Sequence, residues 1–295
     1  METIGVIGLG NMGCGMALSL QRGGFGVVGT DASAATRAAL AAEGVRTVDT
    51  VAEVVRECGV VVLSLPTAAI VTEVVAGAGG ILDAAKAGLL VVDTSTSHPQ
   101  TTRGLAARLE AAGMRLIDAP VSGGPRGAMG GTLTMVIGGA EADLARAEPA
   151  LAAMSAKRVH VGGVGAGHVA KIANNLLCAA HLAIAGEVAR MAQAAGVPTG
   201  QLLEGVNAGS GRSFVTEFNF PTWISNGAFD SGFTMKLMRK DVRLSQELIG
   251  ALDIDLPLAR KVAELWADSA RTLADGEDFN RMAEPVDREA AAAAA

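Results

Sequence analysis

The chain has 295 residues, which suggests two domains or one large domain. Half of the residues are hydrophobic and 18% are charged, so the chain can bury a sizeable core. The formal net charge of −6 argues against a nucleic-acid-binding protein. The sequence contains no run of about 18 uncharged apolar residues, and no basic region precedes the first apolar run. We therefore expect neither a membrane partner nor a secretory signal.

The three cysteines, Cys14, Cys58 and Cys178, are widely spaced and show no metal-ligand spacing. An odd number of separated thiols predicts reduced cysteines in the cytoplasm and no metal site. Residues 289–295 are one glutamate followed by alanines, and we expect this low-complexity tail to be frayed.

Short apolar runs alternate with helix-like segments through the first half of the chain. The runs do not alternate between polar and apolar residues, as is typical of strands covered by helices on both faces. This order predicts a doubly wound, mainly parallel α/β sheet. The expected strands are 4–7, 26–30, 60–65, 89–93, 115–118, 134–138 and 158–161, and the expected helices between them include 34–43 and 100–112.

The sequence changes in character after Gly165. Residues 168 to 195 are rich in alanine and almost free of glycine and proline, which predicts one long helix of near 40 Å. We expect a nucleotide-binding domain over residues 1–164 and an all-helical domain over residues 165–295. The later helices are expected at 199–206, 235–251 and 257–274.

The hexapeptide Gly8-Leu9-Gly10-Asn11-Met12-Gly13 follows the first expected strand and opens a helix. It matches G-x-G-x-x-G, in which glycines permit a tight turn, close approach of a pyrophosphate, and packing of helix against strand. The helix start offers free N–H groups to phosphates. The sequence therefore predicts a Rossmann dinucleotide site at Gly8, Gly10, Asn11, Met12 and Gly13, the alternative being a tight turn without a ligand.

Asp31 ends the second expected strand, about 20 residues after the glycine turn. A carboxylate there accepts hydrogen bonds from the adenosine ribose hydroxyls and repels a 2′-phosphate. No arginine adjoins it, so we expect NAD, with NADP disfavoured. The alternative interpretation of Asp31 is an acid that caps the next helix.

Four further segments join this turn in a fixed order. They are 93–99 (DTSTSHP), 118–124 (DAPVSGG), 165–175 (GAGHVAKIANN) and Lys240-Asp241. Together with the glycine turn they resemble the β-hydroxyacid dehydrogenase family, which includes 3-hydroxyisobutyrate dehydrogenase and tartronate semialdehyde reductase. The resemblance covers about residues 3 to 275, and it implies a Rossmann domain joined by a long helix to an all-helical domain.

The resemblance also implies a role for individual residues. Lys171 matches the family's catalytic lysine and Asn175 its helper on the same helix. The positions that match the substrate site are Ser122, Gly123 and Gly124 for the carboxylate loop, with Phe233 nearby. Those that match the cofactor site are Leu65, Pro66, Thr96 and Lys240.

Oxidising an alcohol requires loss of a hydride from carbon and of a proton from oxygen. The cofactor takes the hydride, and the protein moves the proton. Lys171 can accept that proton only if its pKa falls from about 10.4 toward the working pH, which burial or a nearby cation would cause. At helical spacing, His168, Lys171, Asn175 and Cys178 lie on one stripe. His168 is a rival acid or base, and a solvated surface lysine is the alternative for Lys171.

Two arginines are candidates for reading the far end of the substrate. Arg126 follows the expected anion loop, and Arg212 lies between glycines and Phe214. Either could clamp a second anionic group. We expect Arg212 to do so, although a plain surface arginine is an equal alternative.

The sequence thus predicts an oxidoreductase that uses NAD on a small 3-hydroxy acid such as 3-hydroxyisobutyrate or glycerate. An imine or ketone reductase of the same architecture and a non-catalytic NAD sensor are the alternatives. Lys171, Asn175 and Ser122 together disfavour both. The apolar long helix also predicts a homodimer or homotetramer.

Overall fold

The structure, a computed structural model, describes residues 2–84 and 86–284. Contacts between residues divide the chain into two compact units, Met1–Lys171 and the residues from Ile172 onward. This division falls inside the long helix α9 (Ala166–Ala194), whereas the boundary expected from the sequence stands just before that helix. The tail expected to fray, 289–295, lies outside the described residues.

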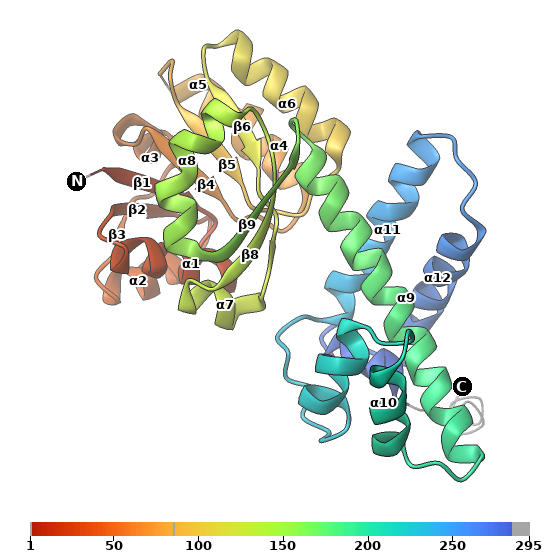
Figure 1. Cartoon of the computed structure of the whole chain (residues 1–295). Coiled ribbons are helices and arrows are strands. Elements are labelled where there is room, and N and C mark those ends of the chain that lie inside the picture. Colours follow the sequence, from red (N-terminus) through yellow and green to blue (C-terminus); the bar gives the residue numbers. More distant parts are fainter. Residues whose placement is uncertain (1, 85, 285–295) are drawn as a thin grey trace. The chain divides into compact units, whose positions relative to one another are not determined.

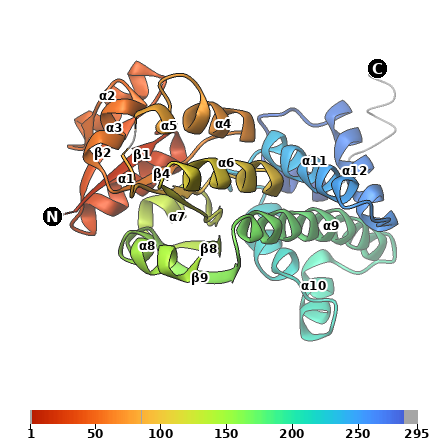
Figure 2. The same cartoon turned by 90° about the horizontal axis from the view of Figure 1, so that it is seen from above.

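The described part of the first unit contains a nine-stranded sheet with helices around it (Figures 1 and 2). The strand order is β3-β2-β1-β4-β5-β6-β8-β7, and β9 pairs with β8. Strands β1 to β6 are mutually parallel, whereas β8 runs antiparallel to β6 and β7 and parallel to β9. The strands are β1 (Thr3–Ile7), β2 (Gly26–Thr30), β3 (Arg46–Thr47), β4 (Val60–Leu63), β5 (Leu90–Asp93), β6 (Arg115–Asp118), β7 (Val121–Ser122), β8 (Leu133–Gly138) and β9 (Ser155–Gly162).

The central strands are buried on both faces, which explains why their sequences are apolar without alternation. Along β4, Val60 and Val62 pack into one core cluster, while Val61 and Leu63 pack into another. Helices α1 (Asn11–Arg22), α7 (Gly124–Gly130) and α8 (Glu141–Met154) contribute to the first cluster, and α3 (Val51–Glu57), α4 (Ala68–Ala76) and α6 (Pro99–Ala111) to the second. The predicted doubly wound, mainly parallel sheet is confirmed.

Helix starts in this unit follow from local side chains. Ser33 caps α2 (Ala34–Ala42) by accepting the Thr36 N–H. Thr50 and Glu53 form a reciprocal capping box at the start of α3. Proline in the first turn of α6 removes an N–H that would have no partner there. The remaining helix of this unit before α9 is the short α5 (Ile81–Ala84).

In the described residues of the second unit the regular elements are helices, as expected, and an isolated antiparallel bridge joins Thr234 to Asp278. Trp266 is fully buried there, and its indole Nε1 donates to the Ala179 carbonyl of α9 at 3.1 Å. The predicted helix 257–274 ends at Asp268, because the chain tightens into a 3₁₀ turn. The elements after α9 are α10 (Thr199–Ala208), the π-helix η1 (Val215–Ile224), α11 (Met235–Ala251), α12 (Pro257–Asp268), η2 (Ser269–Arg271) and η3 (Phe279–Ala283).

Helix α9 has 29 residues and is, within the described ranges, the one helix long and apolar enough to cross a membrane by length and composition alone. The most apolar window has a mean hydropathy of 1.3. The sequence analysis expected no uncharged span, and α9 does carry charged and amide side chains. His168, Lys171 and Asn175 are all buried on it.

Candidate active site

The glycine turn between β1 and α1 is tightly enclosed except at its centre. Gly8 has a φ of +89°, and a Cβ there would meet the Ser64 carbonyl oxygen at 2.3 Å. A Cβ on Gly13 would stand 1.8 Å from the Gly8 oxygen. A Cβ on Gly10, by contrast, would meet nothing within 4 Å. The turn therefore leaves open space beside Gly10, directly before the first N–H groups of α1, as a pyrophosphate requires.

Asp31 lies directly after β2 and is oriented by two backbone N–H groups. Oδ2 accepts the Leu9 N–H at 2.7 Å, and Oδ1 accepts the Ser33 N–H at 2.8 Å. The first contact ties Asp31 to the glycine turn. A carboxylate fixed in this way has lone pairs left for ribose hydroxyls.

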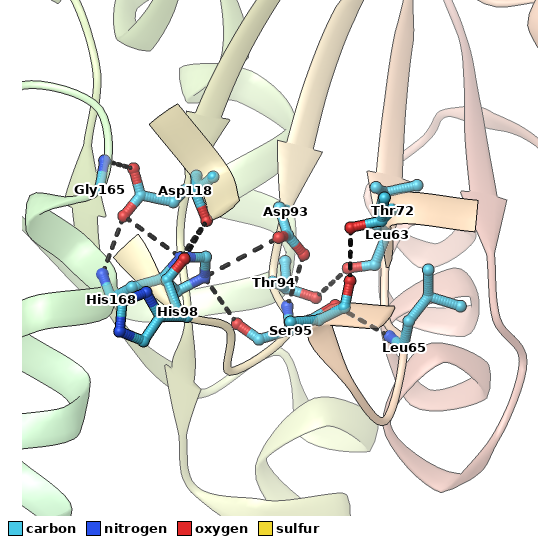
Figure 3. A network of polar contacts seen from close by, with 12 residues as sticks. Leu63, Leu65, Thr72, Asp93, Thr94, Ser95, His98, Asp118, Gly165 and His168 are labelled. Atoms are coloured by element: carbon cyan, nitrogen blue, oxygen red, sulfur yellow. Dashed lines mark hydrogen bonds and ion pairs between the residues drawn. The ribbon is translucent and has the colours of Figure 1, made fainter. Parts of the chain in front are cut away.

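The segments after β4 and β5 lie beside one another and are hydrogen-bonded together (Figure 3). The Leu65 N–H donates to Ser95 Oγ at 3.0 Å, and Thr94 Oγ1 donates to the Leu63 carbonyl at 2.6 Å. Thr96 is half-buried in the β5–α6 loop, and Pro66 is exposed. These loops follow the carboxyl ends of parallel strands, the edge at which open α/β sheets bind ligands.

Lys171 is only 7% exposed, and its Nζ donates to Ser122 Oγ at 2.9 Å. Ser122 ends the short strand β7, which the sequence analysis did not anticipate. Gly123 and Gly124 follow with φ of +123° and +61°, and α7 starts at Gly124. The predicted catalytic lysine and the predicted carboxylate loop are thus in direct contact within one compact unit.

A wholly buried polar cluster underlies the start of α9 (Figure 3). Asp93 and Asp118 end adjacent strands β5 and β6 and are paired in register. The ring of His168, with no exposed surface, lies 3.9 Å from a carboxylate oxygen of each. Asp118 accepts the backbone N–H groups of Gly165 at 2.6 Å and of His168 at 2.8 Å, and so caps α9.

Hydrogen bonds fix the ring of His168. Nε2 lies 2.9 Å from the Ser95 carbonyl, which can only accept, so Nε2 carries a proton. Nδ1 lies 2.9 Å from Thr102 Oγ1 in α6. Burial raises the pKa of Asp118, and the adjacent His168 and the two N–H groups oppose that rise. Both ring nitrogens of His168 therefore already have partners, and the ring has no exposed surface.

In the second unit, Asn175 is held by a charged partner. Its Nδ2 donates to Asp241 Oδ2 at 2.5 Å, and Lys240 Nζ lies 3.2 Å from Asp241 Oδ1. The neighbouring Asn174 donates through Nδ2 to Asn175 Oδ1 at 3.0 Å. Both ends of the Asn175 amide are therefore fixed by neighbours on its own unit.

The remaining predicted residues are less constrained. Phe233 is half-buried and packs edge-on against Phe279, with ring centroids 5.3 Å apart. Arg212 is exposed in the loop between α10 and η1, and Arg126 is exposed in α7. Within the ranges that the structure describes, no group of three or more His, Cys, Asp or Glu side chains could hold a metal ion.

Comparison with known families accounts for nearly the whole chain. The profile described as the NAD binding domain of 6-phosphogluconate dehydrogenase matches residues 3–163. The profile described as NAD-binding of NADP-dependent 3-hydroxyisobutyrate dehydrogenase matches residues 165–286. The chain belongs to the β-hydroxyacid dehydrogenase family.

Individual relatives support the same family assignment. The 2-(hydroxymethyl)glutarate dehydrogenase of Eubacterium barkeri is 36% identical over 89% of this chain and 87% of its own length. The probable 3-hydroxyisobutyrate dehydrogenase of Mycobacterium tuberculosis is 34% identical over 93% of this chain and 95% of its own. A solved structure titled M. tuberculosis 3-hydroxyisobutyrate dehydrogenase with L-serine superposes with a TM-score of 0.91, at 34% identity, over 96% and 98% of the two chains.

The chain is therefore an NAD-dependent hydroxyacid dehydrogenase that acts on a CH–OH group. NAD fits the residues present, because open space adjoins Gly10 and Asp31 is oriented with free lone pairs. The sequence analysis did not identify Asp93 and Asp118 as parts of the site. The available signal was an aspartate at the end of each of two consecutive apolar runs.

Proposed function

We propose that this dehydrogenase oxidises small 3-hydroxy acids in which a CH₂OH group is attached to the carbon bearing the carboxylate. The relatives' names support this class, because 3-hydroxyisobutyrate and 2-(hydroxymethyl)glutarate share that core. L-serine, present with the M. tuberculosis enzyme, and glycerate share it too. These acids differ only in the third substituent on the same carbon.

In this proposal Lys171 is the general base. The observation that carries it is the buried contact between Lys171 Nζ and Ser122 Oγ at 2.9 Å. The backbone around Gly123 and Gly124, with the Ser122 hydroxyl, binds the substrate carboxylate. Lys171 in its neutral form accepts the hydroxyl proton as the C–H bond breaks. NAD, when bound, accepts the hydride, so that an alcohol becomes an aldehyde.

Asn175 and Lys240 have supporting roles in the proposal. The Asp241 carboxylate fixes the Asn175 amide, which then orients the substrate hydroxyl or Lys171. The ammonium of Lys240 is held by the same carboxylate and contributes to cofactor binding. Phe233 adds an apolar wall. The cofactor contacts are the glycine turn, Asp31, Leu65, Pro66 and Thr96.

The decisive experiment replaces Lys171 with methionine, which keeps the length of the side chain but removes the base. We expect NADH formation from 3-hydroxyisobutyrate to fall by about 10²–10⁴-fold, the usual contribution of a general base. NADH binding, followed by its fluorescence, is expected to persist. Lys261→Met is the matched control, because Lys261 is exposed and ion-paired to Glu264. Unchanged turnover in Lys171→Met would rule out this mechanism.

Arg212 is the residue that we propose to recognise the third substituent when it is anionic. Its support is exposure in a glycine-flanked loop and the second carboxylate in the E. barkeri relative's named substrate. Arg212→Ala is expected to raise KM for 2-(hydroxymethyl)glutarate while leaving KM for 3-hydroxyisobutyrate within about twofold, because a lost ion pair affects one substrate only. Arg126→Ala is the comparison. If only Arg126→Ala raises KM for 2-(hydroxymethyl)glutarate selectively, Arg126 and not Arg212 recognises the anionic substituent.

We also propose that a second copy of the chain covers α9. Leu177, Ile184 and Met191 are 58%, 54% and 65% exposed and recur every seven residues. A repeat of seven is the seam of a two-helix contact, which supports a homodimer or a homotetramer built from it.

The remaining parts of the functional assignment follow the sequence. We propose that residues 1–164 bind NAD and that residues 165–295 complete the substrate site and the oligomer. Cys14 and Cys58 are free thiols, which supports a reducing compartment, the cytoplasm. The buried His168, Lys171 and Asn175 on α9 argue against a membrane partner.

A further inference from the structure

The corner of the first unit beside Asp31 contains the parts of a phosphate site. Arg37, on α2, reaches back so that Nη1 donates to the Asp31 main-chain carbonyl at 2.6 Å. Its side chain is only 18% exposed. Ser33 caps the same helix by accepting the Thr36 N–H, and its own N–H donates to Asp31, so α2 starts beside this corner. An arginine, a hydroxyl and a helix start are the groups that proteins use to hold a phosphate monoester.

Two carboxylates already occupy these groups. Asp31 Oδ1 accepts the Ser33 N–H at 2.8 Å. Asp49, just after β3, accepts Nη2 of Arg37 at 2.7 Å, and its own side chain is 80% exposed. A hydrogen bond from Thr30 Oγ1 to the Val48 carbonyl, 2.9 Å long, holds the end of β3 against the end of β2. Asp49 is thereby kept within reach of the guanidinium.

We propose that Asp49 is a specificity-determining residue that excludes NADP by holding Arg37. In a Rossmann fold, the carboxylate after the second strand binds the adenosine ribose, so the 2′ position lies at this corner. A 2′-phosphate brought there meets the negative charge of Asp31 and finds Arg37 already paired with Asp49. NAD brings a hydroxyl and meets no such conflict. Asp31 thus selects for NAD directly, and Asp49 selects against NADP through Arg37.

The test is a comparison of dissociation constants for NADPH and NADH, measured by the fluorescence of each reduced cofactor on binding. It requires no substrate, so its outcome does not depend on which hydroxy acid the enzyme uses. Asp49→Asn is expected to lower the ratio of Kd for NADPH to Kd for NADH by about three- to fivefold at low salt, the size expected for one charge near the surface. The change should shrink in 1 M salt.

Arg37 separates this mechanism from a general charge effect. In an Arg37→Gln background, Asp49→Asn is expected to leave the ratio unchanged, because no guanidinium remains to be released. The control is Glu148→Gln, which neutralises the carboxylate of another pair in this unit, Arg158–Glu148 at 2.9 Å. The control should leave the ratio as in the wild type.

Two results would overturn the proposal. One is a ratio in Asp49→Asn equal to that of the wild type. The other is an equal fall in the ratio with and without Arg37, which would make Asp49 a distant charge only. NADH binding is the check that each variant is folded. Asp49 is largely exposed, so its replacement by asparagine is expected to leave the fold intact.

Discussion

Asp118 is buried without solvent access, and each of its carboxylate oxygens accepts a backbone N–H at the start of α9. A carboxylate suits two such donors, because an amide offers only one acceptor oxygen. The backbone that Asp118 fixes carries Lys171 one turn later. A single side chain at the end of β6 therefore positions the proposed base without touching it.

Asp118→Asn tests this role. The amide nitrogen would face one of the two N–H donors, leaving a buried donor without an acceptor. We expect the free energy of unfolding to fall by about 1–3 kcal/mol, measured by urea denaturation. Asp268→Asn is the control, because Asp268 is exposed in the second unit and its change should stay within about 0.5 kcal/mol. A stable Asp118→Asn protein would mean that the cap contributes little.

For single residues, the sequence was informative where the side chain has one obvious chemical use. It predicted that Lys171 and Ser122 belong together, and they are hydrogen-bonded. It treated His168 as a rival base, and only the structure shows both ring nitrogens engaged. Asp93 and Asp118 were not assigned, because their burial and their pairing across β5 and β6 have no local signature beyond an aspartate at the end of each apolar run.

At the scale of the elements, the glycine turn before α1 contains two glycines, Gly13 and Gly10, whose replacement by alanine is expected to have different effects. Gly13→Ala places a Cβ 1.8 Å from the Gly8 oxygen, so we expect a large loss of thermal stability together with loss of NADH binding. Gly10→Ala meets nothing within 4 Å, so the fold should persist. Its NADH affinity should still fall on the order of tenfold or more, as when hydrogen bonds to a charged group are lost.

Melting curves measure the thermal stability of the two variants, and NADH titrations measure their cofactor affinity; both measurements are needed to test these expectations. Equal loss of stability in both would mean that the turn as a whole, rather than the space beside Gly10, is sensitive to side chains. Equal NADH affinity in Gly10→Ala and the wild type would place the pyrophosphate elsewhere.

Long, strongly patterned elements were predicted best. Helix α9 was expected at 168–195 and spans Ala166–Ala194. Strands β3 and β7 were not anticipated, because two residues give no periodic signal and each forms only through its partner strand. The strand expected at 158–161 starts earlier, at Ser155, where pairing with β8 and not hydrophobicity determines the extent of β9.

For the whole molecule, composition and alternation correctly predicted a mainly parallel sheet followed by helices. They could not predict where contacts divide the chain, because α9 continues through the division at Lys171. The self-association proposed for α9 is likewise a property of the assembled surface, and the repeat of seven residues becomes informative only once exposure is known.

Ile184→Lys tests that assembly. A charge in the middle of the Leu177–Ile184–Met191 seam should be costly to bury, so the variant is expected to have a smaller mass than the wild type by light scattering. Ile70→Lys is the control, since Ile70 is 41% exposed on the first unit and lies outside the seam. The same mass for Ile184→Lys and the wild type would exclude α9 from the contact.

The pairing of Arg37 with the Asp49 carboxylate also bears on how this enzyme could diverge. Aspartate and asparagine codons differ at one nucleotide, so the release of Arg37 from Asp49 is a single genetic step. A lineage that needs reducing equivalents from the other nicotinamide pool would not have to build a phosphate site, because the arginine, the serine and the helix start are already in place. The preference for NAD can then be weakened in one step, while Asp31 continues to favour NAD and Lys171 and its surroundings stay unchanged.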